Sequence, residues 1–261
     1  MQCTGFRESY TAWTYVLECW VLFISILCFA FQGAAEVDKL SAALGEGCAE
    51  LDEDARQGLD ELRQYLALGE GSWVLGDDFL LFIGRILSGT WGTAPIVPTW
   101  RCLCAMALRD DVSLLLHQDR RHHALLNHAH RIDRLPVEEQ LAITYFMCNL
   151  FENISSSEWL LYISEWEHEG QALSNIRTTT KVCVHATLGA EELREAGTAL
   201  LYNIAAKEVK TVVCIALLLT PPLLDYAHPH GIVRQTIHTG LCIIISMLLP
   251  GNSTGKLLFY P

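Results

Sequence analysis

Two asparagines, Asn149 and Asn203, carry the side chains best suited to recognition chemistry in this chain. Each is a single amide close to the end of an apolar helical segment. A primary amide can accept a hydrogen bond from an N–H group and donate one to a carbonyl, so it can pair with a peptide backbone without reading its side chains. The chemistry predicted at these positions is therefore the holding of a peptide.

The helix that carries Asn203 has one buried face and, beside it, a face suited to binding. Apolar residues recur at helical spacing along the first face: Leu193, Ala196, Gly197, Leu200, Leu201, Ile204 and Ala205. The second face places the small residue Ala199 before Asn203, followed by Lys207 and Lys210. A small residue lets a ligand backbone approach, and the two lysines would attract an acidic peptide. The alternative is a helix end that favours cations, with an Asn bonded by a neighbouring loop.

The sequence around Asn149 repeats that around Asn203. Aligning the two asparagines also aligns Ala142 with Ala196 and Thr144 with Thr198. The step is 54 residues (203 − 149), which is longer than the ~40–47 residues of a regular helical repeat. The echo favours an irregular solenoid over a helical bundle.

Helical patterns dominate the middle of the chain, and no segment alternates as a strand would. The breaks between patterns are short, and Pro136 is suited to the start of a helix. The expected helices are 49–67, 77–88, 99–109, 121–132, 137–152, 156–167, 175–188 and 191–210.

Charge divides the chain into three parts. The charged residues are concentrated in 36–214, between an apolar N-terminal flank, 1–35, and an apolar, irregular C-terminal flank, 215–261. The net charge of −12 argues against nucleic acid as a partner. Residues 13–31 are open to two interpretations, a buried or unrelated segment and a signal or membrane anchor.

Other chemistry-bearing residues point to no catalytic centre. Histidines and arginines between 117 and 134 lack the spacing of a helical metal site and are expected to form a solvated face. Trp159 and Trp166 are seven residues apart, so one helix would place both rings on the same face. Ten cysteines form no Cys-x-x-Cys pair, which favours reduced thiols in the cytoplasm. We expect no enzyme activity, metal or cofactor.

Residues 57–214 resemble the PUL domain, the C-terminal module of phospholipase A2-activating protein. The resemblance rests on residues 139–142 leading to 147–151, and on residues 198–205, both of which look like the Asn-containing inner helices of that family. It implies an all-α, armadillo-like superhelix that binds the acidic C-terminal tail of the valosin-containing AAA-type segregase. Family members often carry an Arg one turn before the first Asn, where this chain has Tyr145.

The sequence thus predicts a peptide-binding adaptor of the ubiquitin pathway, located in the cytoplasm and also in the nucleus. Its repeats would be truncated, because the family pattern stops near 214. The expected binding residues are Tyr145, Asn149, Ala199, Asn203, Lys207 and Lys210. The alternatives are a non-catalytic fragment of a PPPDE-type deSUMOylating or deubiquitinating isopeptidase, and a helical protein anchored in a membrane through residues 13–31.

Overall fold

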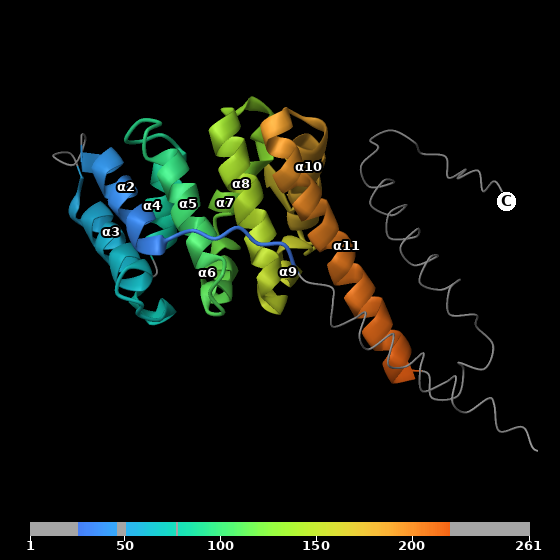
Figure 1. Cartoon of the computed structure of the whole chain (residues 1–261). Helices are drawn as coiled ribbons and strands as arrows, with labels where there is room; N and C mark the ends of the chain where they lie inside the picture. Colours follow the sequence, from blue (N-terminus) through green and yellow to red (C-terminus); the bar gives the residue numbers. More distant parts are fainter. Residues whose placement is uncertain (1–25, 46–50, 77, 220–261) are drawn as a thin grey trace, which may run out of the picture.

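The computed structural model describes residues 26–45, 51–76 and 78–219; for 208–219 it describes the helix but not the side chains. These residues are mostly helical, which confirms the expected all-α class in its coarse form (Figure 1). The α-helices are α2 (Gly33–Gly45), α3 (Glu53–Leu66), α4 (Phe79–Leu87), α5 (Ile96–Met106), α6 (Val112–Asp119), α7 (Ala124–His130), α8 (Val137–Asn149), α9 (Ile154–Leu160), α10 (Asn175–Leu188) and α11 (Glu191–Leu219). The strands are β1 (Glu165–His168) and β2 (Gln171–Ser174).

Nine of these helices follow one another as three units of three: α3–α5, α6–α8 and α9–α11. Equivalent helices of successive units pack against each other, so that α2, α5, α8 and α11 form one layer, which we call the first layer. Helices α4, α7 and α10 form a second layer in the same way. The result is an elongated stack in which each unit contacts mainly its neighbours (Figure 1).

The helix starts follow from local chemistry. Pro136 precedes α8, as expected, because its fixed φ and missing N–H suit a helix start. Asp52 caps α3 by accepting a hydrogen bond from the Ala55 N–H at 3.0 Å. Ser174 caps α10 by accepting from the Arg177 N–H. The predictions for the helices at 137–152 and 175–188 agree closely with the structure, whereas the helix predicted at 191–210 begins as expected but continues to Leu219.

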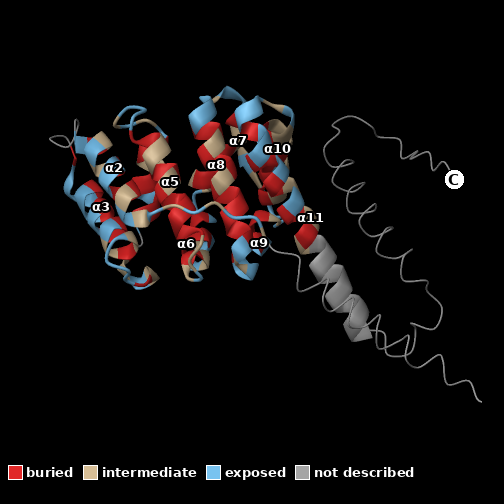
Figure 2. Ribbon diagram, viewed as in Figure 1, coloured by how far each residue is buried: buried red, intermediate tan, exposed pale blue. Residues whose placement is uncertain are grey.

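Buried apolar residues from every α-helix of the described chain form one continuous core, and Figure 2 shows the buried stretches of these helices in red. Trp100 of α5 is fully buried in this core, with its ring centroid 5.4 Å from that of Phe146 of α8. Aromatic pairs of this kind contribute about 0.5–1.5 kcal/mol beyond the area that they bury. The core therefore links successive units and fixes the spacing of the first-layer helices.

The prediction of a helix at 156–167 without any strand was wrong. Helix α9 ends at Leu160, and residues 165–174 form an antiparallel hairpin in which Trp166 pairs with Leu173. Its turn residues Glu169 and Gly170 both have positive φ, as a tight two-residue hairpin turn requires. Trp159 is buried in α9 while Trp166 lies in β1, so the two rings do not share a helix face.

Two helices were not predicted from the sequence. Helix α6 is short and has little apolar periodicity, and α2 begins inside the stretch that was read as an apolar flank. Both belong to the repeating arrangement: α6 contacts α9 of the next unit, and α2 contacts α5 as the first member of the first layer.

Candidate functional site

A segment of the chain's own N-terminal region crosses the first layer. Residues 26–32, which we call the strap, run from the start of α2 across α5 and α8 to α11 (Figure 1). The strap has no regular secondary structure of its own. It passes over Asn149 and Asn203, the two residues expected to hold a peptide.

Asn203 pairs with the backbone of Leu27. The Leu27 N–H donates to Asn203 Oδ1 at 2.8 Å, and Asn203 Nδ2 donates to the Leu27 carbonyl at 2.8 Å. A second Nδ2 hydrogen bond, of 3.2 Å, reaches the Cys148 carbonyl of α8. The side chain lies wholly inside the protein, with the residue 0% exposed, so this amide is fixed between two helices and the strap.

Asn149 makes the same set of bonds one unit earlier. The Phe29 N–H donates to Asn149 Oδ1 at 2.7 Å, and Asn149 Nδ2 donates to the Phe29 carbonyl at 2.8 Å. Its second Nδ2 hydrogen bond, of 3.0 Å, goes to the Cys104 carbonyl of α5. The two asparagines thus bind residues i and i+2 of one extended segment, and that segment runs opposite to the order of the units.

The supporting contacts are repeated as well. Cys104 Sγ donates to the Ala142 carbonyl at 3.3 Å, and Cys148 Sγ donates to the Ala196 carbonyl at 3.4 Å. Cys104 therefore corresponds to Cys148, and Ala105 occupies the place in α5 that Asn149 has in α8. The side chain of Ala105 carries no amide, so among the described residues two asparagines bind the strap backbone and not three.

The structure explains the irregular repeat length. Ala105 precedes Asn149 by 44 residues (149 − 105), within the usual range for helical repeats, whereas Asn149 precedes Asn203 by 54 (203 − 149). The hairpin β1–β2 covers residues 165–174, ten residues inserted between α9 and α10. The insertion accounts for the difference, so the sequence echo reflects equivalent positions in two units.

The ring of Tyr145 packs against aromatic side chains of the strap. Its ring centroid lies 4.1 Å from that of Phe29 and 5.9 Å from that of Phe31. Burial raises the pKa of the Tyr145 hydroxyl, and the nearby Glu195 carboxylate acts in the same direction. The residue that stands where the resembling family often has an Arg is here an aromatic platform for apolar side chains.

An acidic residue faces the middle of the strap. Cys28 is exposed, and its Sγ donates to Glu152 Oε2 at 3.4 Å. Although the residue as a whole is exposed, partial burial of its thiol and then the bond to Glu152 raise the pKa of Cys28 to about 12. The thiol is therefore a neutral hydrogen-bond donor at neutral pH and not a nucleophile.

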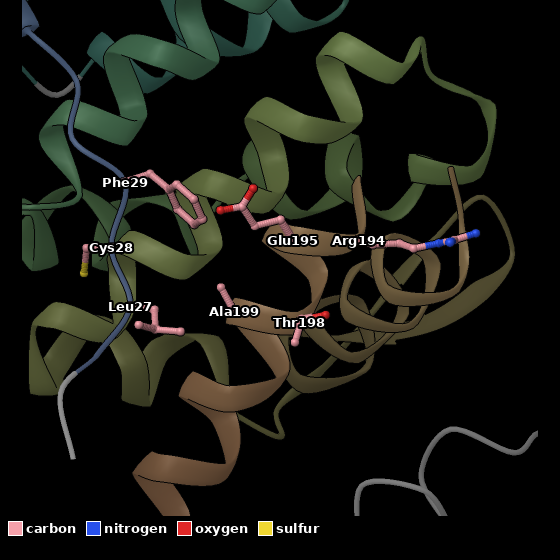
Figure 3. Close-up of a pocket in the computed structure, with 7 residues that line it drawn as sticks. All are labelled: Leu27, Cys28, Phe29, Arg194, Glu195, Thr198 and Ala199. Carbon is pink, nitrogen blue, oxygen red and sulfur yellow. The ribbon is translucent and has the colours of Figure 1, made fainter. Parts of the chain in front are cut away.

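A cavity of about 550 Å³ lies between the strap and the N-terminal half of α11 (Figure 3). Residues 27–29 line one side, and Arg194, Glu195, Thr198 and Ala199 line the other. Figure 3 shows the Leu27 and Phe29 side chains pointing toward α11 and the Arg194 side chain pointing away from the strap. The strap therefore leaves unfilled space beside its apolar side chains.

The remaining predicted binding residues lie along α11. Ala199 is buried and lines the cavity. Lys207 Nζ donates to Ser157 Oγ at 2.8 Å, which ties α11 to α9. The side chain of Lys210 lies outside the described residues. The structure thus brings Tyr145, Asn149, Asn203 and Ala199 together around the strap.

The expected solvated face between 117 and 134 is present only in part: the exposed residues are His117, Arg120, Arg121, His122 and Arg134, whereas His123, His130 and Arg131 are half-buried. His128 is buried, at 4% exposure, and its Nε2 is hydrogen-bonded to Glu139. Arg131 bonds to the other ring nitrogen of His128 at 3.1 Å. The prediction of solvation was wrong for His128, because the apolar residues around it on α7 carry it into the core. No cluster of three metal-ligating side chains occurs within the described ranges.

Sequence reasoning missed the strap and Glu152. All but the last residue of the strap fall in the stretch 13–31, which was read either as a buried or unrelated segment or as a signal or membrane anchor; residues 13–25 lie outside the described part of the chain. No helix in the portion that the structure describes is long and apolar enough to cross a membrane. Large residues at alternate positions, Leu27, Phe29 and Phe31, were the available signal for an extended segment.

Comparison with known proteins gives no relative: no family model, curated protein or solved structure matches the chain. The functional argument therefore rests on the geometry around the strap.

Proposed function

We propose that the chain is a peptide-binding module with an armadillo-like superhelical fold, which holds an extended segment along α5, α8 and α11. The single observation that carries the proposal is the pair of buried asparagines, each bound to both the N–H and the C=O of one strap residue. The three-helix units, the equivalent first-layer positions and the ordinary 44-residue step support the armadillo-like description.

Recognition of the backbone explains why amides suit this role. The N–H and C=O groups within a helix are used in its own ladder, so a helical surface can bind an extended chain only through side chains. Asn149 and Asn203 are buried, and each is held by a further bond to the preceding first-layer helix. Such an amide is pre-organised, which lowers the entropic cost of binding.

The first candidate ligand is the acidic C-terminal tail of the valosin-containing segregase, which the PUL resemblance nominates. Lys207 and Lys210 follow Asn203 by one and two turns of α11 and support this assignment through their charge. In this role the protein is an adaptor of the ubiquitin pathway that contributes no catalytic residue.

Fluorescence anisotropy with labelled peptides tests the proposal on the full chain. Peptides of two kinds are titrated: the acidic tail, and the sequence of residues 26–32. In the chain whose strap is already weakened by Phe29→Ala, Asn203→Ala is expected to weaken peptide binding at least tenfold, because the ligand loses the two hydrogen bonds that Asn203 makes with Leu27 of the strap.

Asn153→Ala is the matched control. Asn153 also uses its Nδ2 to bond two carbonyls across helices, those of Ala107 at 3.4 Å and Arg109 at 3.1 Å, but has no bond to the strap. It should lower stability without changing peptide affinity. If neither kind of peptide binds the wild-type chain or a variant with a weakened strap, the proposed function is wrong.

A further inference from the structure

The sequence of the strap indicates which ligands would bind in its place, on the surface along α5, α8 and α11 that we call the peptide groove. Its sequence is Ile26-Leu27-Cys28-Phe29-Ala30-Phe31-Gln32, in which the larger residues at 27, 29 and 31 alternate with the smaller residues at 28 and 30. In an extended chain, alternate side chains point to the same side. The backbone bonds at residues 27 and 29 fix this register, so the alternation is matched to the two clamps.

The side that receives the large residues is apolar and incompletely filled. Phe29 and Phe31 both pack near Tyr145, and Leu27 faces the cavity beside α11 (Figure 3). Leu27 remains 45% exposed. The position at Leu27 therefore has room for a larger apolar side chain, whose burial would favour binding.

Two carboxylates determine which charge is favoured in a segment bound in place of the strap. Glu152 lies against the position of Cys28, and Glu195 lines the cavity against the positions of Leu27 and Phe29. Arg194 lines the same cavity, but its side chain points away from the strap (Figure 3). An acidic ligand residue at the position of Cys28 would bring two negative charges together, whereas a donor or a basic side chain would bond to Glu152.

We propose that the strap is a built-in ligand of the peptide groove and that a partner must displace it with a segment of the same chemical class. That class is an extended segment with bulky apolar residues at alternate positions and a hydrogen-bond donor or a basic residue at the position of Cys28. The inference rests on the proposed peptide-binding function and adds the identity of the competing segment and the preferred sequence. It favours a neutral or basic segment over the acidic tail at this part of the groove.

The strap is covalently attached, which makes it an effective competitor. The strap is joined directly to α2, which begins at Gly33. A detached strap therefore stays near its binding surface at an effective concentration of about millimolar, the value for a short tether. A weakened strap should therefore raise the affinity for a peptide added in trans. Phe29→Ala removes the ring that packs on Tyr145, and we expect it to tighten binding about tenfold. Ala30→Ser, at an exposed position without a backbone clamp, is the control and should leave affinity unchanged.

The charge preference is tested with two peptides of the sequence 26–32 that differ at one position, Cys28→Lys and Cys28→Glu. Both are titrated into the full-length Phe29→Ala protein, with the Leu27→Pro protein as a second way to open the groove. The Lys peptide should bind about tenfold more tightly than the Glu peptide. Glu152→Gln in the protein should reduce this difference to about twofold or less, because it removes the charge that discriminates.

The outcomes separate the two proposals. Equal affinities for the Lys and Glu peptides, or an acidic tail that binds more tightly than either, would overturn the inference and leave peptide binding intact. Unchanged affinity in both strap-weakened proteins would show that the strap does not compete. Failure of every peptide to bind would reject the proposed function, and with it the inference.

Discussion

Replacing Leu27 with proline removes one donor of the strap and little else. Proline has no N–H, so the 2.8 Å bond to Asn203 Oδ1 is lost, while the Leu27 carbonyl can still accept from Asn203 Nδ2. An extended segment tolerates the fixed φ of proline. The side chain of Leu27 is 45% exposed, so its replacement changes the buried apolar area only modestly.

The magnitude follows from the burial of Asn203. A hydrogen bond contributes about 0.5–1.5 kcal/mol net, and an acceptor left unsatisfied inside the protein adds about 1–3 kcal/mol. Because Asn203 is 0% exposed, we expect the strap to be destabilised by about 1.5–4.5 kcal/mol. That corresponds to an increase of at least about tenfold, and at most about 2,000-fold, in the detached population.

Limited digestion with chymotrypsin, followed by mass spectrometry, measures this population. Cleavage after Phe29 or Phe31 requires the strap to leave the groove, and its rate follows the open fraction when reclosing is fast. Ala30→Pro is the matched control, because its N–H makes no clamp with either asparagine. Leu27→Pro should accelerate cleavage after Phe31 at least tenfold relative to Ala30→Pro. Equal rates for the two proline variants would refute the clamping of the strap by Asn203.

Three further predictions concern stability and reactivity. Burial raises the pKa of Asp119 to about 7, so ionisation of this buried carboxyl lowers the free energy of unfolding progressively between about pH 4 and pH 7. Asp119→Asn should remove this pH dependence and stabilise the protein at pH 8 by at most about 4 kcal/mol, as measured by urea titrations at pH 4 and pH 8. Gly197→Ala should lower the melting temperature by several degrees, because the added Cβ would meet α10 backbone atoms as near as 2.4 Å, whereas Gly45→Ala, with nothing within 4 Å, should not. Cys28 should react with iodoacetamide at pH 8 at least tenfold more slowly than a free thiol, and Glu152→Gln should accelerate the reaction; equal rates would contradict the raised pKa of this thiol.

The two clamp residues could be predicted from the sequence because their signal is local. Asn149 and Asn203 lie at equivalent positions in helices with clear periodicity. In the structure each donates a hydrogen bond to a carbonyl of the preceding first-layer helix, so the sequence similarity between the two helices corresponds to equivalent contacts. Helices with a strong start signal, such as the one after Pro136, were placed within a few residues.

The occupant of the groove could not be predicted, because its bonds connect residues distant in the sequence. Leu27 and Asn203 are 176 positions apart, and Phe29 and Asn149 are 120 apart. A strap clamped by side chains needs no capping residue and no partner strand, so its apolar composition alone suggested an anchor. The hairpin at 165–174 was missed for a related reason: its four-residue strands are too short to show an alternating pattern.

Residue-resolved amide hydrogen exchange in the wild-type chain tests the central claim most directly. The clamps bind the N–H groups of Leu27 and Phe29, while those of Cys28 and Ala30 make no bond to either asparagine. The account predicts alternating protection, with the amides of Leu27 and Phe29 exchanging at least tenfold more slowly than those of Cys28 and Ala30 after correction for sequence. Uniform exchange across residues 27–30 would contradict it.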